Sequence, residues 1–192
     1  MISKKFVVLT GIDGSGKDYV AQHLHKFDPH SSLMSTPTPP FLPSRSEIDS
    51  FALSIPATHY FFYLASIIHA SEIIKQKLDY GNVYCGRYLI DTVVYHRAMG
   101  LLVELEYETH LYKIKRPDTT IFLEIDDEQV RQERLNKRGK FTIGDKLVND
   151  EQLRNAIKKE YESLSNNYIK VDNCGRNIQD VVTEIQELIG FA

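Results

Sequence analysis

The chain of 192 residues contains no tryptophan and only two cysteines, Cys85 and Cys174. Two cysteines form no disulfide framework, and their spacing fits no metal-binding motif. No apolar run reaches the roughly 20 residues that cross a bilayer, and Lys4 and Lys5 precede a short strand-like run rather than a signal peptide. The net charge of −3 does not indicate a surface for nucleic acid or anionic membranes. We therefore expect a cytoplasmic protein with reduced thiols that binds neither nucleic acid nor membrane.

One glycine-rich stretch, residues 11–17, reads GIDGSGK and fits the spacing G-x-x-x-x-G-K. Residues 6–9 before it form an apolar run that is typical of a buried strand. After it, apolar side chains recur at helical spacing, at Val20, Leu24 and Phe27. A strand, a glycine loop and a helix in this order predict a phosphate-binding P-loop, and a glycine turn without a ligand is the alternative.

The chemistry of this loop suits the phosphates of ATP. Its glycines let backbone N–H groups turn inward around an anion, and the N-terminus of the next helix favours negative charge. Lys17 supplies a positive charge to the β- and γ-phosphates. Asp18 stands where the motif has a Ser or Thr that holds Mg²⁺, so we expect Asp18 to ligate Mg²⁺, with helix capping as the alternative. The ATP-binding residues predicted in this loop are Gly11, Asp13, Gly14, Ser15, Gly16, Lys17 and Asp18.

Strand-like and helix-like patterns alternate along the rest of the chain, which indicates an α/β fold with a parallel sheet. Ligands in such sheets bind beyond the carboxyl ends of the strands. Five prolines between residues 29 and 43 predict an irregular segment, either a substrate-side loop or a mobile linker. The patterns predict further strands at 32–35, 82–85, 119–125 and 168–171, and helices at 58–78, from 88 to about 99, and at 101–112, 126–138, 151–164 and 178–189.

Three stretches in this order, GIDGSGK at 11–17, VYCGRY at 83–88 and PDTTIFLEIDDEQVRQERLNKRGK at 117–140, resemble motifs of the thymidylate kinase family. The resemblance covers nearly the whole chain. It implies one three-layer α/β P-loop kinase domain over 1–192, a central parallel sheet flanked by helices, and a lid at about 138–149. It further implies transfer of the γ-phosphate of ATP, with Mg²⁺, to a dTMP-like nucleoside monophosphate in nucleotide biosynthesis, and it suggests a homodimer through the long helices.

The resemblance also implies roles for basic residues. Arg87 matches an arginine that holds the acceptor phosphate, for which a planar guanidinium is well suited. Arg134 and Arg138 share one helical face and match arginines that contact ATP. Lys17, Arg87 and Arg134 are therefore the expected catalytic residues. The alternatives are a surface salt bridge for Arg87 and a solvated basic face for the helix.

Five side chains are expected to bind the acceptor. Asp13 matches an aspartate that reaches a sugar hydroxyl, although it also suits loop capping. Phe62 matches an aromatic that stacks on the base, or else it packs in the core. Ser66, one turn later, replaces an arginine that reads the base, and we expect it to face the same pocket. Thr92 and Tyr95 match residues that line the base pocket, with helical core packing as the alternative for Tyr95.

Several positions depart from the family's pattern near the expected metal and acceptor. Gly86 replaces a carboxylate, and Ser35-Thr36-Pro37 replaces an Arg-Glu-Pro motif. Residues 141–145 replace the later arginine motif of the lid. Basic residues that can compensate for the lost charges are Arg45, Arg97, Lys140 and Lys146.

The sequence thus leaves three hypotheses. The first is an ATP-dependent kinase of a nucleoside monophosphate, which accounts for the P-loop, Arg87 and the arginine helix. The second is a nucleotide-binding protein that has lost catalysis, which accounts for the departures clustered near the metal and acceptor positions. The third is a kinase of a non-nucleotide acceptor, which accounts for Ser66 and the proline-rich segment.

Overall fold

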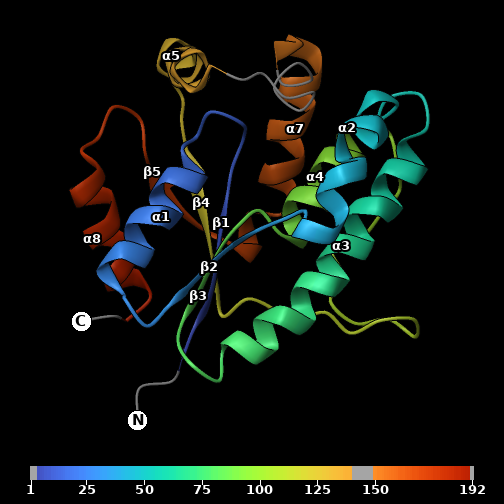
Figure 1. Ribbon diagram of the computed structural model, residues 1–192. Helices are drawn as coiled ribbons and strands as arrows, with labels where there is room; N and C mark the ends of the chain where they lie inside the picture. Colours follow the sequence, from blue (N-terminus) through green and yellow to red (C-terminus); the bar gives the residue numbers. More distant parts are fainter. Residues whose placement is uncertain (1–3, 140–148, 191–192) are drawn as a thin grey trace.

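The structure is a computed structural model that describes residues 4–139 and 149–190. The expected lid, at about 138–149, therefore lies mostly outside the described residues. Within them, all strand pairings of the central sheet are parallel, in the order β2-β3-β1-β4-β5 (Figure 1). The strands are β1 (Phe6–Thr10), β2 (Ser32–Ser35), β3 (Val83–Gly86), β4 (Thr119–Glu124) and β5 (Ile169–Asp172).

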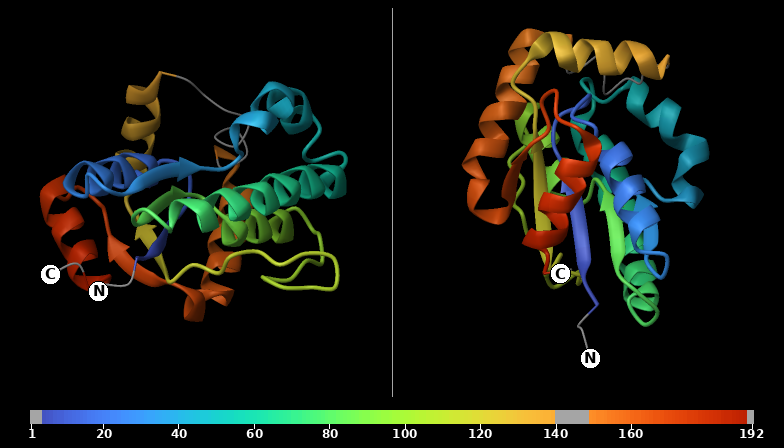
Figure 2. Two further views of the ribbon diagram at one scale, coloured as in Figure 1. Left: turned by 60° about the horizontal axis from the view of Figure 1, so that its bottom comes forward. Right: turned by 90° about the vertical axis from the view of Figure 1, so that its left-hand side faces the viewer.

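Helices cover both faces of this sheet. In Figure 1, α1 and α8 lie on one face and α3, α4 and α7 lie on the other, while α5 lies across the carboxyl ends of the strands. The right-hand view in Figure 2 looks onto the sheet with α1 and α8 in front. The helices are α1 (Lys17–Phe27), α2 (Leu42–Ser50), α3 (Pro56–Lys77), α4 (Leu89–Ala98), α5 (Glu128–Arg138), α7 (Glu151–Ser163) and α8 (Ile178–Leu188), with short 3-10 turns at Pro39–Phe41 and Ser165–Asn167.

The central strand β1 shows why the fold has three layers. Its side chains alternate between two apolar clusters, as the two-residue period of a strand requires. Val7 and Leu9 pack with α1 and α8, whereas Phe6 and Val8 pack with α3 and α4. Because both faces are covered, the whole strand is apolar and buried, which is typical of parallel sheets. The predicted α/β fold with a central parallel sheet is confirmed.

Two sequence expectations were wrong. Residues 101–112 form no helix, because the apolar side chains at Leu101, Val103, Leu105 and Tyr107 recur every second residue and pack on the core from an extended segment. The proline-rich region also contains a helix, α2, that the sequence reading missed. Three of the five prolines lie in the 3-10 turn before α2 and in the first turn of α2, where a proline needs no N–H partner.

A third difference concerns Phe27, whose helical spacing with Val20 and Leu24 predicted one apolar face. Its side chain, at the end of α1, is 49% exposed. No helix in the described part of the chain is long and apolar enough to cross a membrane.

Candidate active site

The loop between β1 and α1 has the backbone that a phosphate site needs. Gly11, Gly14 and Gly16 all have positive φ, at 142°, 92° and 89°, a region that strongly favours glycine. Helix α1 begins at Lys17 without a side-chain cap, whereas α5, α7 and α8 each have one. The first N–H groups of α1 thus have no side-chain acceptor of their own and remain available to an anion.

Lys17 lies inside the loop. Its Nζ donates to the carbonyl oxygens of Gly11 at 2.8 Å and Ile12 at 3.0 Å, and lies 3.4 Å from Asp13 Oδ1. The residue is 3% exposed. Burial, and then the nearby Arg87, lower the pKa of Lys17. The ammonium is therefore close to the glycine loop, and its present partners are ones that a phosphate oxygen can replace.

Arg87 follows β3 directly and has an unusual backbone. Among the described residues it is the only non-glycine with positive φ, at 66°, and such strain is common at functional sites. Its Nη2 donates to Asp13 Oδ1 at 2.8 Å, and its Nη1 donates to Asp18 Oδ2 at 3.1 Å. The strained turn thus directs the guanidinium between two carboxylates at the P-loop.

Asp13 is a buried carboxylate held by these two cations. Burial raises the pKa of Asp13, but Lys17 and Arg87 offset this effect and hold the pKa below its ordinary value. Its backbone oxygen also accepts a hydrogen bond from Arg131 Nη1 at 3.0 Å. Asp13 therefore remains ionised at neutral pH and orients Arg87.

Asp18 and Gly86 are directly related. The Asp18 carboxylate is half exposed and faces Arg87, and a Cβ on Gly86 would lie 2.5 Å from Asp18 Oδ1. Burial raises the pKa of Asp18, but the charges of Arg87 and Lys17 outweigh this effect, so the pKa is below its ordinary value. Glycine at position 86 therefore makes room for the carboxylate that position 18 supplies.

Two arginines of α5, Arg131 and Arg134, donate hydrogen bonds to the backbone of the P-loop. Arg131 is fully buried, donates to the Asp13 backbone and pairs with Glu128 at 2.6 Å. Arg134 donates to the carbonyl oxygens of Ser15 at 3.2 Å and Asn173 at 2.6 Å. Arg134 is thus tied to the P-loop rather than being part of a solvated face. The contact of Ser15 with Arg134 is through its backbone carbonyl oxygen, and the Ser15 side chain is buried.

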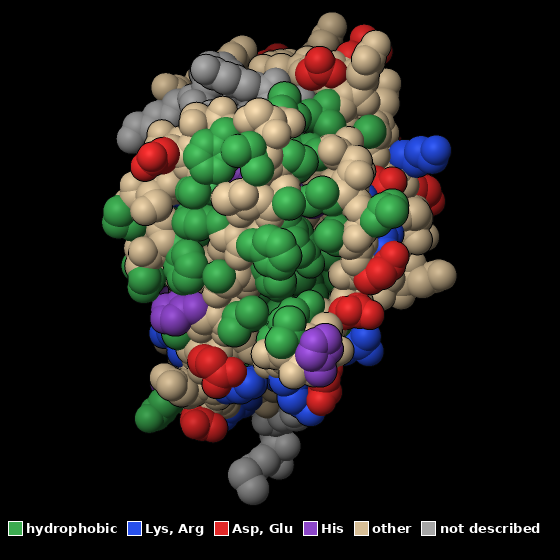
Figure 3. Space-filling view, turned by 90° about the vertical axis from the view of Figure 1, so that its right-hand side faces the viewer, with side chains coloured by type: hydrophobic (Ala, Val, Ile, Leu, Met, Phe, Trp, Pro, Cys, Tyr) green, Lys and Arg blue, Asp and Glu red, His purple; other side chains and the backbone are tan. Residues whose placement is uncertain are grey.

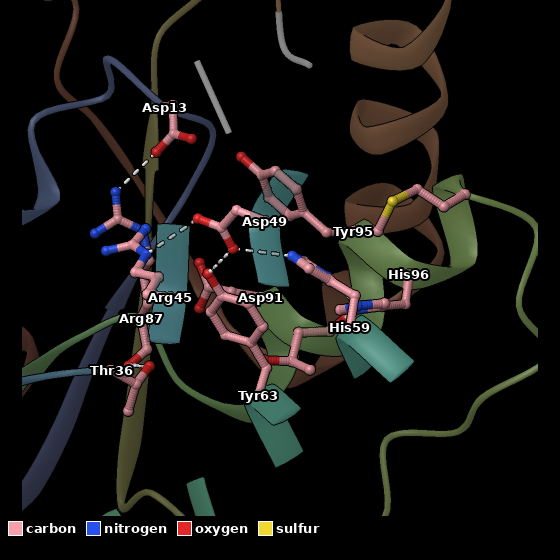
Figure 4. A pocket seen from close by; sticks show the side chains of 12 residues that line it. Asp13, Thr36, Arg45, Asp49, His59, Tyr63, Arg87, Asp91, Tyr95 and His96 are labelled. Carbon is pink, nitrogen blue, oxygen red and sulfur yellow. Dashed lines mark hydrogen bonds and ion pairs between the residues drawn. The ribbon is translucent and has the colours of Figure 1, made fainter. Parts of the chain in front are cut away.

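Two cavities meet at Arg87. The first, which we call the loop cavity, holds about 700 Å³ and lies over the P-loop and α5. The second, which we call the inner pocket, is narrower, at about 80 Å³, and lies between the P-loop, α2, α3 and α4 (Figure 4). The loop cavity is lined in part by Gly14, Gly16, Lys17, Asp18, Arg134 and Arg138. Arg87 lines both.

The inner pocket contains some of the expected acceptor residues. Asp13, Arg87, Thr92 and Tyr95 line it, and burial raises the pKa of Tyr95. Arg45 and Arg87 both line this pocket, and Figure 4 shows Arg45 reaching toward Asp49 and Arg87 toward Asp13. Two guanidinium groups that line one pocket are a suitable site for a phosphate.

Phe62 and Ser66 lie elsewhere, so the expectation that they face this pocket was wrong. Ser66 is fully buried against the proline-rich segment, where its Oγ accepts the backbone N–H of Thr38 at 2.8 Å. Phe62 packs edge-on against Phe41, with ring centroids 5.6 Å apart. Their side chains leave α3 toward the segment that precedes α2.

Of the basic residues considered as replacements, Arg45 reaches the pocket and Arg97 does not. Arg97 Nε donates to the carbonyl oxygen of Val103, and its guanidinium also pairs with Glu104. Lys140 and Lys146 lie outside the described residues. Sequence reasoning missed the remaining polar wall of the inner pocket, Asp49, His59, Tyr63 and His96, as well as the buried Arg131. The sequence signal for His59, Tyr63 and His96 was the presence of ionisable residues in the largely apolar helices α3 and α4.

Comparison with known proteins gives a consistent result. A profile of the thymidylate kinase family matches residues 9–185. Curated relatives include probable thymidylate kinases of Methanocaldococcus jannaschii, 28% identical over 96% of this chain and 95% of theirs, and of Pyrococcus horikoshii, 27% identical with the same coverage.

Solved structures agree with the fold. A thymidylate kinase from Candida albicans matches with a TM-score of 0.72 and 20% identity, covering 98% of this chain and 92% of that one. A deoxyadenosine kinase from M. mycoides matches with a TM-score of 0.66 and 15% identity, covering 97% and 100%. The expected family and the expected class of enzyme, a nucleotide kinase, are therefore confirmed, and the chain belongs to the thymidylate kinase family.

Proposed function

We propose that this protein transfers the γ-phosphate of ATP to the phosphate of a dTMP-like deoxynucleoside monophosphate. The observation that carries the proposal is the position of Arg87, which lines both the loop cavity and the inner pocket. Phosphoryl transfer requires the donor and acceptor phosphates to meet in line, with their charges neutralised. Arg87 occupies the place where two phosphates bound in these cavities would meet.

On the donor side, ATP would bind in the loop cavity. The backbone of Gly11, Gly14, Ser15 and Gly16 would surround the phosphates, and Lys17 would exchange its carbonyl partners for β- and γ-oxygens. Arg134 and Arg138 line the same cavity from α5 and are suited to the remaining phosphate charge and the adenine face.

On the acceptor side, the phosphate would bind between Arg87 and Arg45, and the nucleoside would extend along the inner pocket. Asp13 stands near the P-loop end of this pocket, where its carboxylate is suited to a sugar hydroxyl. Thr92 and Tyr95 line the pocket from α4, where a base would lie. Arg45 would supply the positive charge that Ser35-Thr36-Pro37 lacks.

Asp18 fits Mg²⁺. Its half-exposed carboxylate lines the loop cavity beside Lys17, and Gly86 leaves the carboxylate the space it occupies. Mg²⁺ commonly takes one or two carboxylates together with waters and phosphate oxygens, so one such ligand suffices. When bound, the ion would neutralise charge on the β- and γ-phosphates.

The reaction itself needs little covalent help from the chain. An oxygen of the acceptor phosphate bonds to the γ-phosphorus while the bond from that phosphorus to the bridging oxygen of ADP breaks, and ADP leaves with the electron pair. Lys17 and Arg87 would neutralise the negative charge of the transferring phosphoryl group, and the N–H groups of the loop would bind its oxygens. Lys17, Arg87 and Arg134 are the proposed catalytic residues.

The proposal is tested by a transfer assay with Mg-ATP against a panel of acceptors: dTMP, dUMP, dCMP, dGMP and non-nucleotide phosphates. Transfer to one or more of the deoxynucleoside monophosphates, lost in Arg87→Ala and partly kept in Arg87→Lys, supports it. Transfer only to non-nucleotide acceptors contradicts it, and so does ATP binding without transfer to any member of the panel.

We also propose that the protein forms a homodimer through α3. Leu53, Ile55 and Phe61, which lie on α3 or just before it, are between 51% and 64% exposed. Figure 3 shows hydrophobic side chains gathered on this face of the molecule. A contiguous apolar face commonly marks an interaction site. Light scattering should give twice the chain mass for the parent and the single chain mass for Phe61→Glu; a monomeric parent would contradict the proposal.

The cytoplasm is the proposed compartment, with nucleotide biosynthesis as the role. Both cysteines are free thiols in the structure, and Cys85 is buried in the core beside the P-loop. Reduced structural thiols suit a reducing compartment. Cell fractionation that recovers the protein with membranes or outside the cytoplasm would contradict this assignment.

A further inference from the structure

A continuous line of hydrogen bonds leads from Arg45, at the phosphate end of the inner pocket, into the protein (Figure 4). Arg45 Nε donates to Asp49 Oδ2 at 3.3 Å. The other carboxylate oxygen, Oδ1, accepts from the Tyr63 hydroxyl at 2.8 Å and lies 3.1 Å from His59 Nε2. His59 Nδ1 lies 2.8 Å from His96 Nε2. The line therefore connects α2 to α3 and α4.

At the far end of this line, the contacts of His96 determine which of its ring nitrogens carries a proton. His96 Nδ1 lies 2.6 Å from the carbonyl oxygen of Thr92, which only accepts, so Nδ1 carries a hydrogen. Burial lowers the pKa of His96 to about 4, so the ring is neutral at neutral pH and its Nε2 has a lone pair. That lone pair accepts a hydrogen bond from His59 Nδ1.

At the near end of this line, the Asp49 carboxylate contacts His59. Burial raises the pKa of Asp49, but the hydrogen bonds from His59 and Tyr63 and the charge of Arg45 hold the pKa below its ordinary value. The carboxylate is therefore ionised, and its two oxygens hold Arg45 on one side and His59 on the other.

One buried carboxylate thus contacts two basic side chains. Asp49 is 7% exposed, with Arg45 on one side and His59 on the other. Asp49 accepts from Nε of the Arg45 guanidinium, at 3.3 Å. Arg87 lines the same pocket as Arg45. The two guanidinium groups therefore bring positive charge to the pocket in which the acceptor phosphate is proposed to bind.

We propose that Asp49 and His59 are positioning residues for the acceptor phosphate: Asp49 holds Arg45 in the pocket that Arg87 also lines, and His59 holds Asp49. The inference rests on the proposed function. Affinity for the acceptor phosphate would then depend on His59 of α3 through Asp49 and Arg45, rather than through a contact of its own with the phosphate. A purely structural role, in which these residues only join the helices, predicts a different result, because loosening the helices would weaken binding of the whole acceptor.

The test compares dTMP with thymidine, which lacks only the phosphate. Dissociation constants for both, and for ATP, are measured by calorimetry or by competition in the parent, Arg45→Ala, Asp49→Asn, His59→Gln and the double variant Arg45→Ala/Asp49→Asn. Glu47→Gln, an exposed acidic position on the same helix, is the matched control. ATP affinity reports whether each variant retains its fold.

We expect Asp49→Asn to weaken dTMP binding by about tenfold or more and thymidine binding by less than about twofold, with ATP binding unchanged. His59→Gln should show the same selectivity. The double variant should bind dTMP no more weakly than Arg45→Ala alone, because Asp49 acts through Arg45. Glu47→Gln should match the parent.

Equal losses for dTMP and thymidine, or losses that multiply in the double variant, would overturn the inference while leaving the proposed function intact. A parent protein that binds ATP but neither binds dTMP nor transfers phosphate to it would overturn the proposed function, and this inference with it.

Discussion

Asp18 and Gly86 share one volume: Asp18 Oδ1 lies 2.5 Å from the position that a Cβ on Gly86 would take. Asp18 and Gly86 both depart from the family's pattern, and the two departures are therefore linked. The carboxylate of Asp18, on α1, occupies the space that a side chain at position 86, at the end of β3, would need. Asp18 also pairs with Arg87 at 3.1 Å, which ties this carboxylate to the residue shared by both cavities.

The first prediction is that positions 18 and 86 are coupled. Gly86→Asp alone should crowd two carboxylates and weaken Mg-ATP binding, because like charges repel at short distance. Asp18→Ser alone should also weaken it by removing the carboxylate. The reciprocal exchange, Asp18→Ser with Gly86→Asp, should bind Mg-ATP more tightly than either single variant. Calorimetry of the four proteins measures the coupling, and additive losses would show that the two positions act independently.

The second prediction concerns metal dependence. If Asp18 ligates Mg²⁺, its carboxylate repels ATP phosphates when no metal is supplied, at a cost of about 4 kcal/mol at most before screening. Asp18→Thr should therefore strengthen binding of metal-free ATP and narrow the gap between ATP and Mg-ATP. Titrations with EDTA and with Mg²⁺ provide the two affinities. If the Asp18→Thr protein matches the parent in both titrations, Asp18 does not ligate Mg²⁺, and helix capping remains as its role.

The third prediction concerns Lys17, whose Nζ lies within the glycine loop. Lys17→Ala removes a charge-assisted contact to phosphate, so ATP affinity should fall by about 1.5–3 kcal/mol, roughly ten- to a hundredfold. Lys26→Ala, at an exposed position near the end of the same helix, is the matched control. Unchanged ATP affinity in Lys17→Ala would remove the basis for placing ATP in the loop cavity.

The fourth prediction is a pH dependence of stability that arises from His96. Burial lowers the pKa of His96 from 6.5 to about 4, so the folded state favours the neutral ring. This contribution is complete above pH 6.5 and is lost as the pH falls toward 4. The free energy of unfolding should fall across this window by about 3 kcal/mol at most.

Urea denaturation at several pH values measures this slope. His96→Gln should be less stable at neutral pH and should show a smaller slope between pH 6.5 and 4, whereas His110→Gln, at an exposed position, should keep the slope of the parent. An unchanged slope in His96→Gln would mean that other groups cause the acid sensitivity.

The sequence was most informative where structure is local. The P-loop and the strand before it depend on neighbouring residues, so their pattern predicted the order of strand, glycine loop and helix that the structure shows. Arg87 was also predictable, because the residue after a parallel strand lies at the ligand-binding edge of the sheet. Even so, its positive φ and its pairing with Asp18 required the structure.

The acceptor side was less predictable because its contacts join distant elements. Asp49, His59 and His96 meet only when α2, α3 and α4 pack, and no spacing in the sequence connects them. Ser66 was assigned to the wrong side of α3 because family position alone does not determine which neighbour covers a helix face. The segment 101–112 shows a different error, since its two-residue apolar period was read as helical.

The most direct test of the account follows the phosphate itself. The protein is incubated with Mg²⁺, dTMP and ATP labelled at the γ-phosphate, and the products are separated to locate the label. The account predicts that the label appears in the β-phosphate of dTDP, at a rate that falls by about a hundredfold or more in Arg87→Ala, since one well-placed donor to the transferring group is worth about that much. Label that remains in ATP, or that is released only as inorganic phosphate while dTMP stays unchanged, would contradict it.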